Sequence, residues 1–110
     1  ALRWATLVHA MAITAAHGSA LRSGEALAAA GLSEARFTRL MAARGEAFRD
    51  QLVLAARLVA SKQIPIHWGD LADLLMADEA EEEIAGRLRF RIAQSYYRAL
   101  RKQDQSAQSA

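Results

Sequence analysis

The stretch GLSEARFTRL, residues 31–40, has the residue types of a nucleic-acid-binding element. Its glycine ends an alanine-rich helix, Ser33 caps the next helix, and that helix carries Arg36 and Arg39. An outward-facing arginine offers a planar fork of hydrogen-bond donors that matches the oxygens of a phosphate group. The stretch therefore predicts either a helix-turn-helix unit that reads DNA bases or a helix that holds a nucleic-acid backbone.

A row of arginines in the last predicted helix points to the same kind of ligand. Arg87, Arg91 and Arg98 project together beside the apolar stripe of this helix over three turns. Six basic residues and one acid follow the acidic run DEAEEE (78–83), although the formal net charge of the chain is only +2. A second interpretation stays open, because acids at the start of a helix and bases at its end also complement the helix dipole.

Catalytic and metal-binding motifs are not found in the sequence. The histidines His9, His17 and His67 lie in different segments, and none has a partner at the spacing of a metal site. No serine lies in a Gly-x-Ser-x-Gly turn, and no cysteine is present to form a disulfide or a thiolate site. We therefore expect a protein that is not an enzyme, with no catalytic residue, metal site or cofactor.

Length and composition favour one small helical domain. Of the 110 residues, 53% are hydrophobic and 26 are alanine, while strand-forming residues are scarce. No apolar run reaches the ~18 residues of a membrane span and no signal-peptide pattern is present, so we expect a cytoplasmic protein. Because the sequence begins with Ala1 rather than methionine, we expect it to be part of a longer chain.

Helix signals predict an all-α fold, a single compact bundle of about five to six helices over residues 1–102. Capping residues and glycines separate the helices, and Pro65 requires a loop before the fifth one. Residues 103–110 are polar and are expected to form a disordered tail. The predicted helices span about residues 2–16, 23–30, 33–45, 46–62, 67–76 and 79–102.

Apolar side chains at helical spacing locate the predicted core. The expected core residues are Phe37, Leu40 and Met41 in the third helix, Phe48, Leu52, Leu54, Ala55, Leu58 and Val59 in the fourth, and Ile84, Leu88, Ile92, Tyr96 and Ala99 in the last. Trp68 is also assigned to the core. Tyr97 lies off the stripe, so it is the one aromatic residue left as a candidate for stacking on a base.

The helix-turn-helix interpretation fits residues 25–41 only in part. The glycine of the turn, Phe37 and Leu40 occupy matching positions. Leu27, however, stands four residues before the glycine, where alanine is usual, and its bulk would push the two helices apart. The third helix also lacks the Asn and Gln side chains that read bases, leaving Thr38 and two arginines. A helix-turn-helix transcription regulator stays as the alternative, and a structural adaptor as a third hypothesis.

Four motifs follow one another in an order typical of a known family. They are SGEALAAAGLSEARFTRLM, an apolar helix that bears an arginine, PIHWGDLADLL and RFRIAQSYYRA, and the comparison covers residues 1–100. This order resembles the small subunit of the type I-E CRISPR Cascade complex, the CasB family. Members of that family are usually longer at the N-terminus, where a basic helix precedes the first helix of this chain.

The resemblance implies a non-catalytic subunit that stabilises the R-loop in antiviral defence, while guide pairing reads the sequence. The implied partners are crRNA, both strands of the target DNA, the large and backbone Cascade subunits and a second copy of the chain, with no membrane and no small-molecule substrate. Arg36 matches the arginine of the family's E-x-R segment, and Arg57 matches the surface arginine of the next helix. The others rest on helix geometry. The candidate nucleic-acid-binding residues are Arg36, Arg39, Arg44, Arg57, Arg87 and Arg91.

Overall fold

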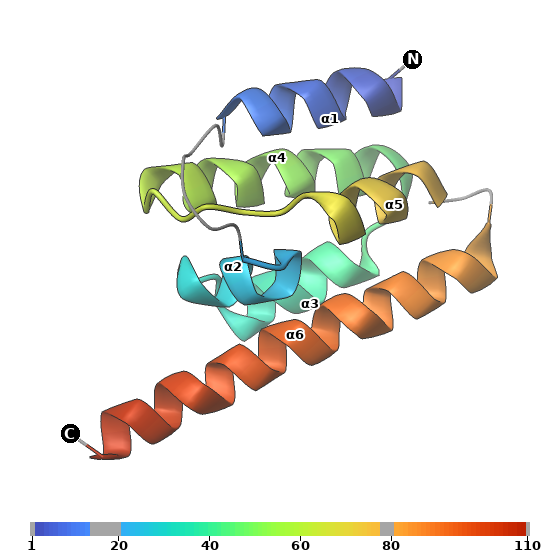
Figure 1. The fold of residues 1–110 in the computed structure, drawn as a ribbon. Helices are drawn as coiled ribbons and strands as arrows, with labels where there is room; N and C mark the ends of the chain where they lie inside the picture. The colour runs from blue at the N-terminus through green and yellow to red at the C-terminus, as the bar shows by residue number, and fades with distance from the viewer. Residues whose placement is uncertain (1, 14–20, 78–80, 110) are drawn as a thin grey trace.

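The computed structural model describes residues 2–13, 21–77 and 81–109, and this part of the chain forms six helices (Figure 1). The helices are α1 (Leu2–Ile13), α2 (Ser23–Ala29), α3 (Glu34–Ala42), α4 (Gly45–Ser61), α5 (Gly69–Ala77) and α6 (Glu82–Ser109). Within the described residues, strand-like pairing is limited to one isolated bridge between Leu21 and Ile66. The predicted all-α bundle of five to six helices is therefore confirmed.

The helices are stacked so that α1 and α6 lie on opposite sides of the molecule (Figure 1). α1 packs on α4 and α5, α3 packs on α4, and α6 crosses the far side against α2 and α5. Trp68 is partly buried against the core. The buried residues that the apolar spacing predicted are Phe37, Leu40, Phe48, Leu52, Ala55, Val59, Leu88, Ile92 and Tyr96.

The start of α2 is fixed to the loop that precedes α5. The backbone amide of Leu21 donates to the carbonyl oxygen of Pro65 at 3.0 Å. The backbone amide of His67 donates to the carbonyl oxygen of Leu21 at 2.7 Å. The buried Ser23 adds a side-chain bond, in which its Oγ donates to the carbonyl oxygen of His67 at 2.9 Å. These bonds hold together two segments that are more than forty residues apart.

The turn between α2 and α3 follows the predicted capping pattern. Gly31 has a φ of +86°, the left-handed region in which glycine ends helices without strain. The amide of Leu32 then donates back to the carbonyl oxygen of Leu27. Ser33 caps α3, since its Oγ accepts from the amide of Arg36 at 3.2 Å. The cap fixes the first turn of α3 and therefore the position of Arg36.

An aromatic cluster joins α3 to α6. The ring of Phe37 stacks on that of Tyr96, with 3.9 Å between the centroids and 5° between the planes. Tyr97 meets both rings edge-on. The hydroxyl of Tyr96 donates to the carbonyl oxygen of Leu32. Burial, and secondarily the Glu34 carboxylate, raises the pKa of Tyr96 above its ordinary value.

Two predicted core residues are wrong. Leu54 is 57% exposed because it faces a groove along α4 that α3 leaves open. Ile84 is 40% exposed, and its neighbour Ala85 is fully buried in its place. One residue corresponds to about 100° around a helix, so a small error in the centre of the stripe moves a side chain from the core to the surface. Met41, Leu58 and Ala99 are only partly buried.

The last helix ends later than the sequence predicted. We expected α6 to end near Lys102, whereas the helix continues to Ser109. The expected disorder of residues 103–110 stays a prediction. No glycine or proline interrupts the segment, and Nε2 of Gln103 donates to the carbonyl oxygen of Ala28 at 3.0 Å. This bond attaches α6 to the end of α2 beyond the predicted boundary. The expected ends of the first helix and of the acidic run include residues 14–16 and 78–80, which lie outside the described residues.

Candidate nucleic-acid interface

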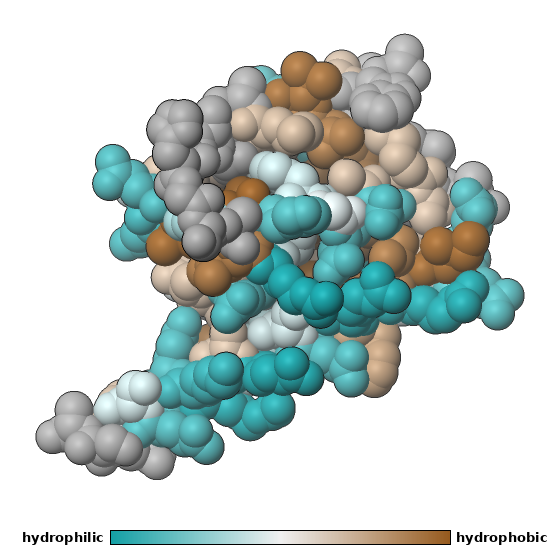
Figure 2. All heavy atoms as spheres, viewed as in Figure 1, coloured by the Kyte–Doolittle hydropathy of each residue, from teal (hydrophilic) through white to brown (hydrophobic). Residues whose placement is uncertain are grey.

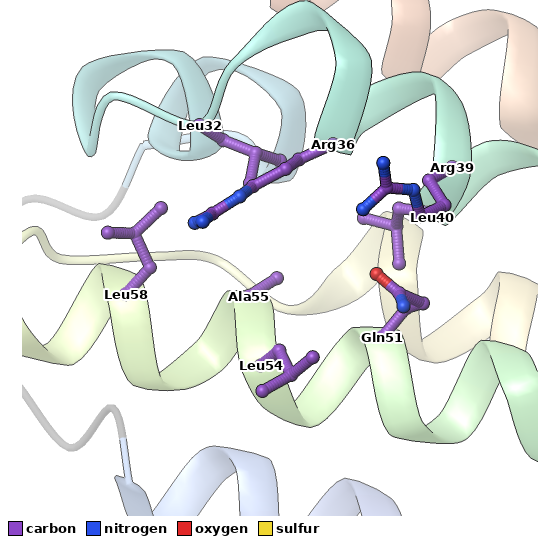
Figure 3. Close-up of a pocket in the computed structure, with 8 residues that line it drawn as sticks. All are labelled: Leu32, Arg36, Arg39, Leu40, Gln51, Leu54, Ala55 and Leu58. Carbon is purple, nitrogen blue, oxygen red and sulfur yellow. The ribbon is translucent and has the colours of Figure 1, made fainter.

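Arg36 and Arg39 lie together at a groove between α3 and α4 (Figure 3). α3 buries Phe37 and Leu40 against the bundle, which leaves the two arginines beside α4 with their side chains exposed. The groove has a volume of about 270 Å³. Its lining residues are Leu32, Arg36, Arg39, Leu40, Gln51, Leu54, Ala55 and Leu58. Two guanidinium groups therefore stand over a largely apolar floor, with the Gln51 amide opposite.

Arg44 stands at the turn between α3 and α4. Its Nη1 donates to the carbonyl oxygen of Met41 at 2.9 Å and to that of Ala43 at 3.0 Å. Gly45 follows with a φ of +60°, a conformation that suits glycine at this sharp reversal. Arg44 thus closes the end of α3. Because its Nη1 serves the turn, only the other N–H groups of its guanidinium are available to a ligand.

Arg57 is exposed on α4 but does not line the groove. The core face of α4 contains Leu52, Ala55 and Val59, and Arg57 projects from the other side of the helix. The structure therefore brings Arg36 and Arg39 to one groove and leaves Arg57 on a separate surface of the same helix. A ligand that contacts all three would have to follow α4 around its exposed side.

Arg87 and Arg91 both project from the exposed side of α6. Nη1 of Arg91 lies 3.6 Å from Oδ1 of Asp70 on α5, and Nη1 of Arg89 lies 3.6 Å from Oε1 of Glu82. Hydrophilic residues cover the part of the surface over α6 in Figure 2, whereas hydrophobic ones gather over α1. Arg87 and Arg91, two residues of the basic row predicted from the sequence, are thus exposed on the folded chain.

Ion pairs within the described residues leave most of the candidate arginines without a carboxylate partner. Arg91 is the candidate that forms a pair with a described acid. The side chains without such a pair are those of Arg36, Arg39, Arg44, Arg57 and Arg87. Unpaired arginines on a surface retain their full set of donors for an anion, with the exception of Arg44, whose Nη1 serves the turn.

The comparison with protein families decides what kind of protein carries this surface. The sequence model of the CRISPR-associated protein Cse2 family matches residues 2–97, most of the chain. The chain belongs to the Cse2 family. Its resemblance to CasB, the Cascade small subunit, is thereby confirmed, and the protein is a subunit of a CRISPR Cascade complex that assembles with other subunits. No curated protein and no solved structure matched the chain.

Membership of the Cse2 family does not favour the helix-turn-helix alternative, and the packing of α2 agrees. In a helix-turn-helix unit the two helices cross tightly on each other, but here α2 lies chiefly against α6. Gly24 allows α2 to approach α6 closely, and Leu27 is buried in the core. α3 follows as a helix of nine residues whose arginines face α4.

The sequence analysis of this Cse2 protein missed Phe90 and Arg101, which lie beside Tyr97, the aromatic residue kept as a candidate for stacking on a base. Phe90 is 59% exposed and lies in a hollow of α6 together with Tyr97, Arg98 and Arg101. Arg98 was noted in the row but not chosen as a site residue. The spacing of Phe90, Tyr97 and Arg101, at i, i+7 and i+11, is that of one helical face and could have identified them.

The described residues were also searched for metal and membrane features. No group of three or more potential metal-ligating side chains occurs among them. No helix within residues 2–13, 21–77 and 81–109 combines the length and apolar character needed to cross a membrane. Nδ1 of His67, one of the histidines weighed in the sequence, accepts from the amide of Gly69 at 3.1 Å and so belongs to the start of α5.

Proposed function

We propose that this Cse2 family protein is a non-catalytic small subunit of a type I-E Cascade complex. It binds the target strand and the displaced DNA strand through sequence-independent phosphate contacts and thereby stabilises the R-loop in the cytoplasm. The observation that carries the proposal is the set of exposed arginines on α3, α4 and α6 that have no carboxylate partner among the described residues. Its partners are crRNA, the target DNA, the large and backbone subunits and a second copy of the chain.

Phosphate contacts suit this task because guide pairing already reads the sequence. The formation of an R-loop exchanges one duplex for another of similar stability, so a small additional stabilisation shifts the balance. A charge-assisted hydrogen bond contributes about 1.5–3 kcal/mol, and less where water screens it. A few arginines such as Arg36, Arg39 and Arg87 are therefore sufficient to favour the open state.

The test uses Cascade reconstituted with the other subunits, crRNA and a target duplex. The double substitution Arg36→Ala with Arg57→Ala should lower R-loop stability, while the helicity and melting temperature of the subunit remain those of the wild type. The loss should be larger at low salt, because each phosphate contact that is removed lowers the slope of log K against log[salt] by about 0.7 to 0.9.

Lys62→Ala is the matched control, since it removes an exposed positive charge at the end of α4 outside the candidate set. It should leave the R-loop unchanged. Wild-type R-loop stability in the double variant would contradict the phosphate role of Arg36 and Arg57. A preference of about 10³-fold for one duplex sequence would instead support the transcription-regulator hypothesis.

A further inference from the structure

Phe90 is a large aromatic side chain on the exposed side of α6, and the bundle does not explain why it is there. It is 59% exposed, although a phenylalanine normally contributes to stability by burial. A single exposed apolar residue is common in proteins and by itself indicates no function. What distinguishes Phe90 is the group of side chains that shares its hollow.

The hollow beside Phe90 combines aromatic, amide and cationic groups on one helix face. Its volume is about 420 Å³, and its lining residues are Phe90, Ala93, Gln94, Tyr97, Arg98 and Arg101. No carboxylate is among these residues. Phe90 and Tyr97 are seven residues apart, about 10 Å along the helix axis, and the small side chain of Ala93 leaves the space between them open.

The two aromatic residues of the hollow differ in how firmly they are held. Tyr97 is partly buried and meets the rings of Phe37 and Tyr96 edge-on, with centroids 5.8 Å and 5.1 Å apart. It therefore forms a rigid wall at one end. Phe90 is the exposed ring at the other end, and Arg98 and Arg101 lie one turn apart on the same side of α6.

We infer that this hollow of α6 binds single-stranded DNA, with a base stacked on Phe90 and the adjoining phosphates held by Arg98 and Arg101. Stacking between a base and an aromatic ring is tolerant of sequence, and cationic side chains beside the ring hold the backbone. A paired base in duplex DNA does not offer its face, so the hollow distinguishes an unpaired strand from a duplex. The inference rests on the proposed function and adds to it a contact with the bases of the displaced strand.

The test compares two labelled 20-mers in fluorescence anisotropy at low salt with the full chain. One is oligothymidylate, and the other carries abasic sites with the same number of phosphates. Phe90→Ala should weaken binding of the thymidylate strand about five-fold or more, and should leave binding of the abasic strand unchanged. Arg98→Ala with Arg101→Ala should weaken the binding of both strands.

Val8→Ala is the matched control, because Val8 is 61% exposed but lies on α1, on the opposite side of the molecule. It should bind both strands like the wild type. If Phe90→Ala weakens both strands equally or neither, base stacking is wrong while the phosphate contacts of the proposed function stand. Both proposals fail if the wild type binds neither strand and both double variants, Arg36→Ala with Arg57→Ala and Arg98→Ala with Arg101→Ala, form normal R-loops in Cascade. A change in self-association of Phe90→Ala without a change in DNA binding would assign the hollow to a second copy of the chain and overturn the inference.

Discussion

The backbone of Gly24 in α2 lies directly on the carbonyl oxygen of Ile92 in α6. A Cβ atom added at Gly24 would stand 2.2 Å from that oxygen and 2.8 Å from the backbone nitrogen of Tyr96. Both contacts are with backbone, which cannot move aside as the end of a flexible side chain can. The crossing of α2 and α6 therefore requires glycine, and it sets where α3 and its arginines lie relative to α6.

We predict that Gly24→Ala lowers the free energy of unfolding by about 1–3 kcal/mol, the usual cost of overpacking. This loss should occur although alanine is the better helix former by about 1 kcal/mol. Urea unfolding followed by circular dichroism measures the change. Gly86→Ala is the control, since Gly86 lies in α6 with no neighbour within 4 Å of an added Cβ, and it should stabilise the protein. An equal loss in both variants would contradict the role of the crossing.

The pKa of Tyr96 predicts a loss of stability at alkaline pH. Burial and the Glu34 carboxylate raise its pKa above the ordinary value of 10.0. An unfolded tyrosine ionises first, so the stabilising difference is complete below pH 10 and is lost as the pH rises through the raised pKa. Urea unfolding at several pH values should show this decline in the wild type.

Tyr96→Phe tests the assignment of that decline. The variant should be less stable at neutral pH by about 1–3 kcal/mol, because the carbonyl oxygen of Leu32 loses its donor. Above pH 10 its unfolding free energy should decline less steeply than that of the wild type. Parallel curves for the two proteins would assign the alkaline loss to other groups.

The bond from Gln103 to the carbonyl oxygen of Ala28 predicts that the end of α6 contributes to stability. Gln103→Ala should lower the free energy of unfolding by about 1 kcal/mol and speed hydrogen exchange in the last turns of α6. Gln105→Ala, an exposed position in the same helix, serves as the control and should change neither quantity. Fast exchange throughout residues 103–109 in the wild type would support the disordered tail expected from the sequence.

Features that depend on one helix at a time were predictable from the sequence. The cap at Ser33, the turn at Gly31 and the buried face of α4 all follow from local spacing and residue type. The motifs and their order along the chain also gave the resemblance to CasB, and the family comparison confirms it.

Features that depend on the distance between helices were not predictable in the same way. Leu54 has the right spacing for a core residue, but α3 leaves the groove beside it open. The stacking of Phe37 on Tyr96 joins residues 59 positions apart, which no helical period encodes. For the same reason the sequence did not show which candidate arginines lie together: Arg36 and Arg39 line the groove, whereas Arg57 does not.

The ion pair between Arg91 and Asp70 predicts a competition with nucleic acid. The Arg91 side chain is 56% exposed and that of Asp70 is 18% exposed, so a phosphate can reach the guanidinium group but meets the carboxylate beside it. Asp70→Asn should therefore raise the affinity for single-stranded DNA, by up to about five-fold for an exposed pair. Fluorescence anisotropy at low salt measures the change.

Asp73→Asn separates the release of Arg91 from the change in net charge. Asp73 is an exposed residue of α5, and none of the ion pairs found among the described residues involves it. If Arg91 contacts phosphate, Asp70→Asn should raise the affinity clearly more than Asp73→Asn does, and adding Arg91→Ala should abolish the difference. Equal gains from the two substitutions would mean that only the overall charge of the surface matters and that Arg91 is not a direct ligand.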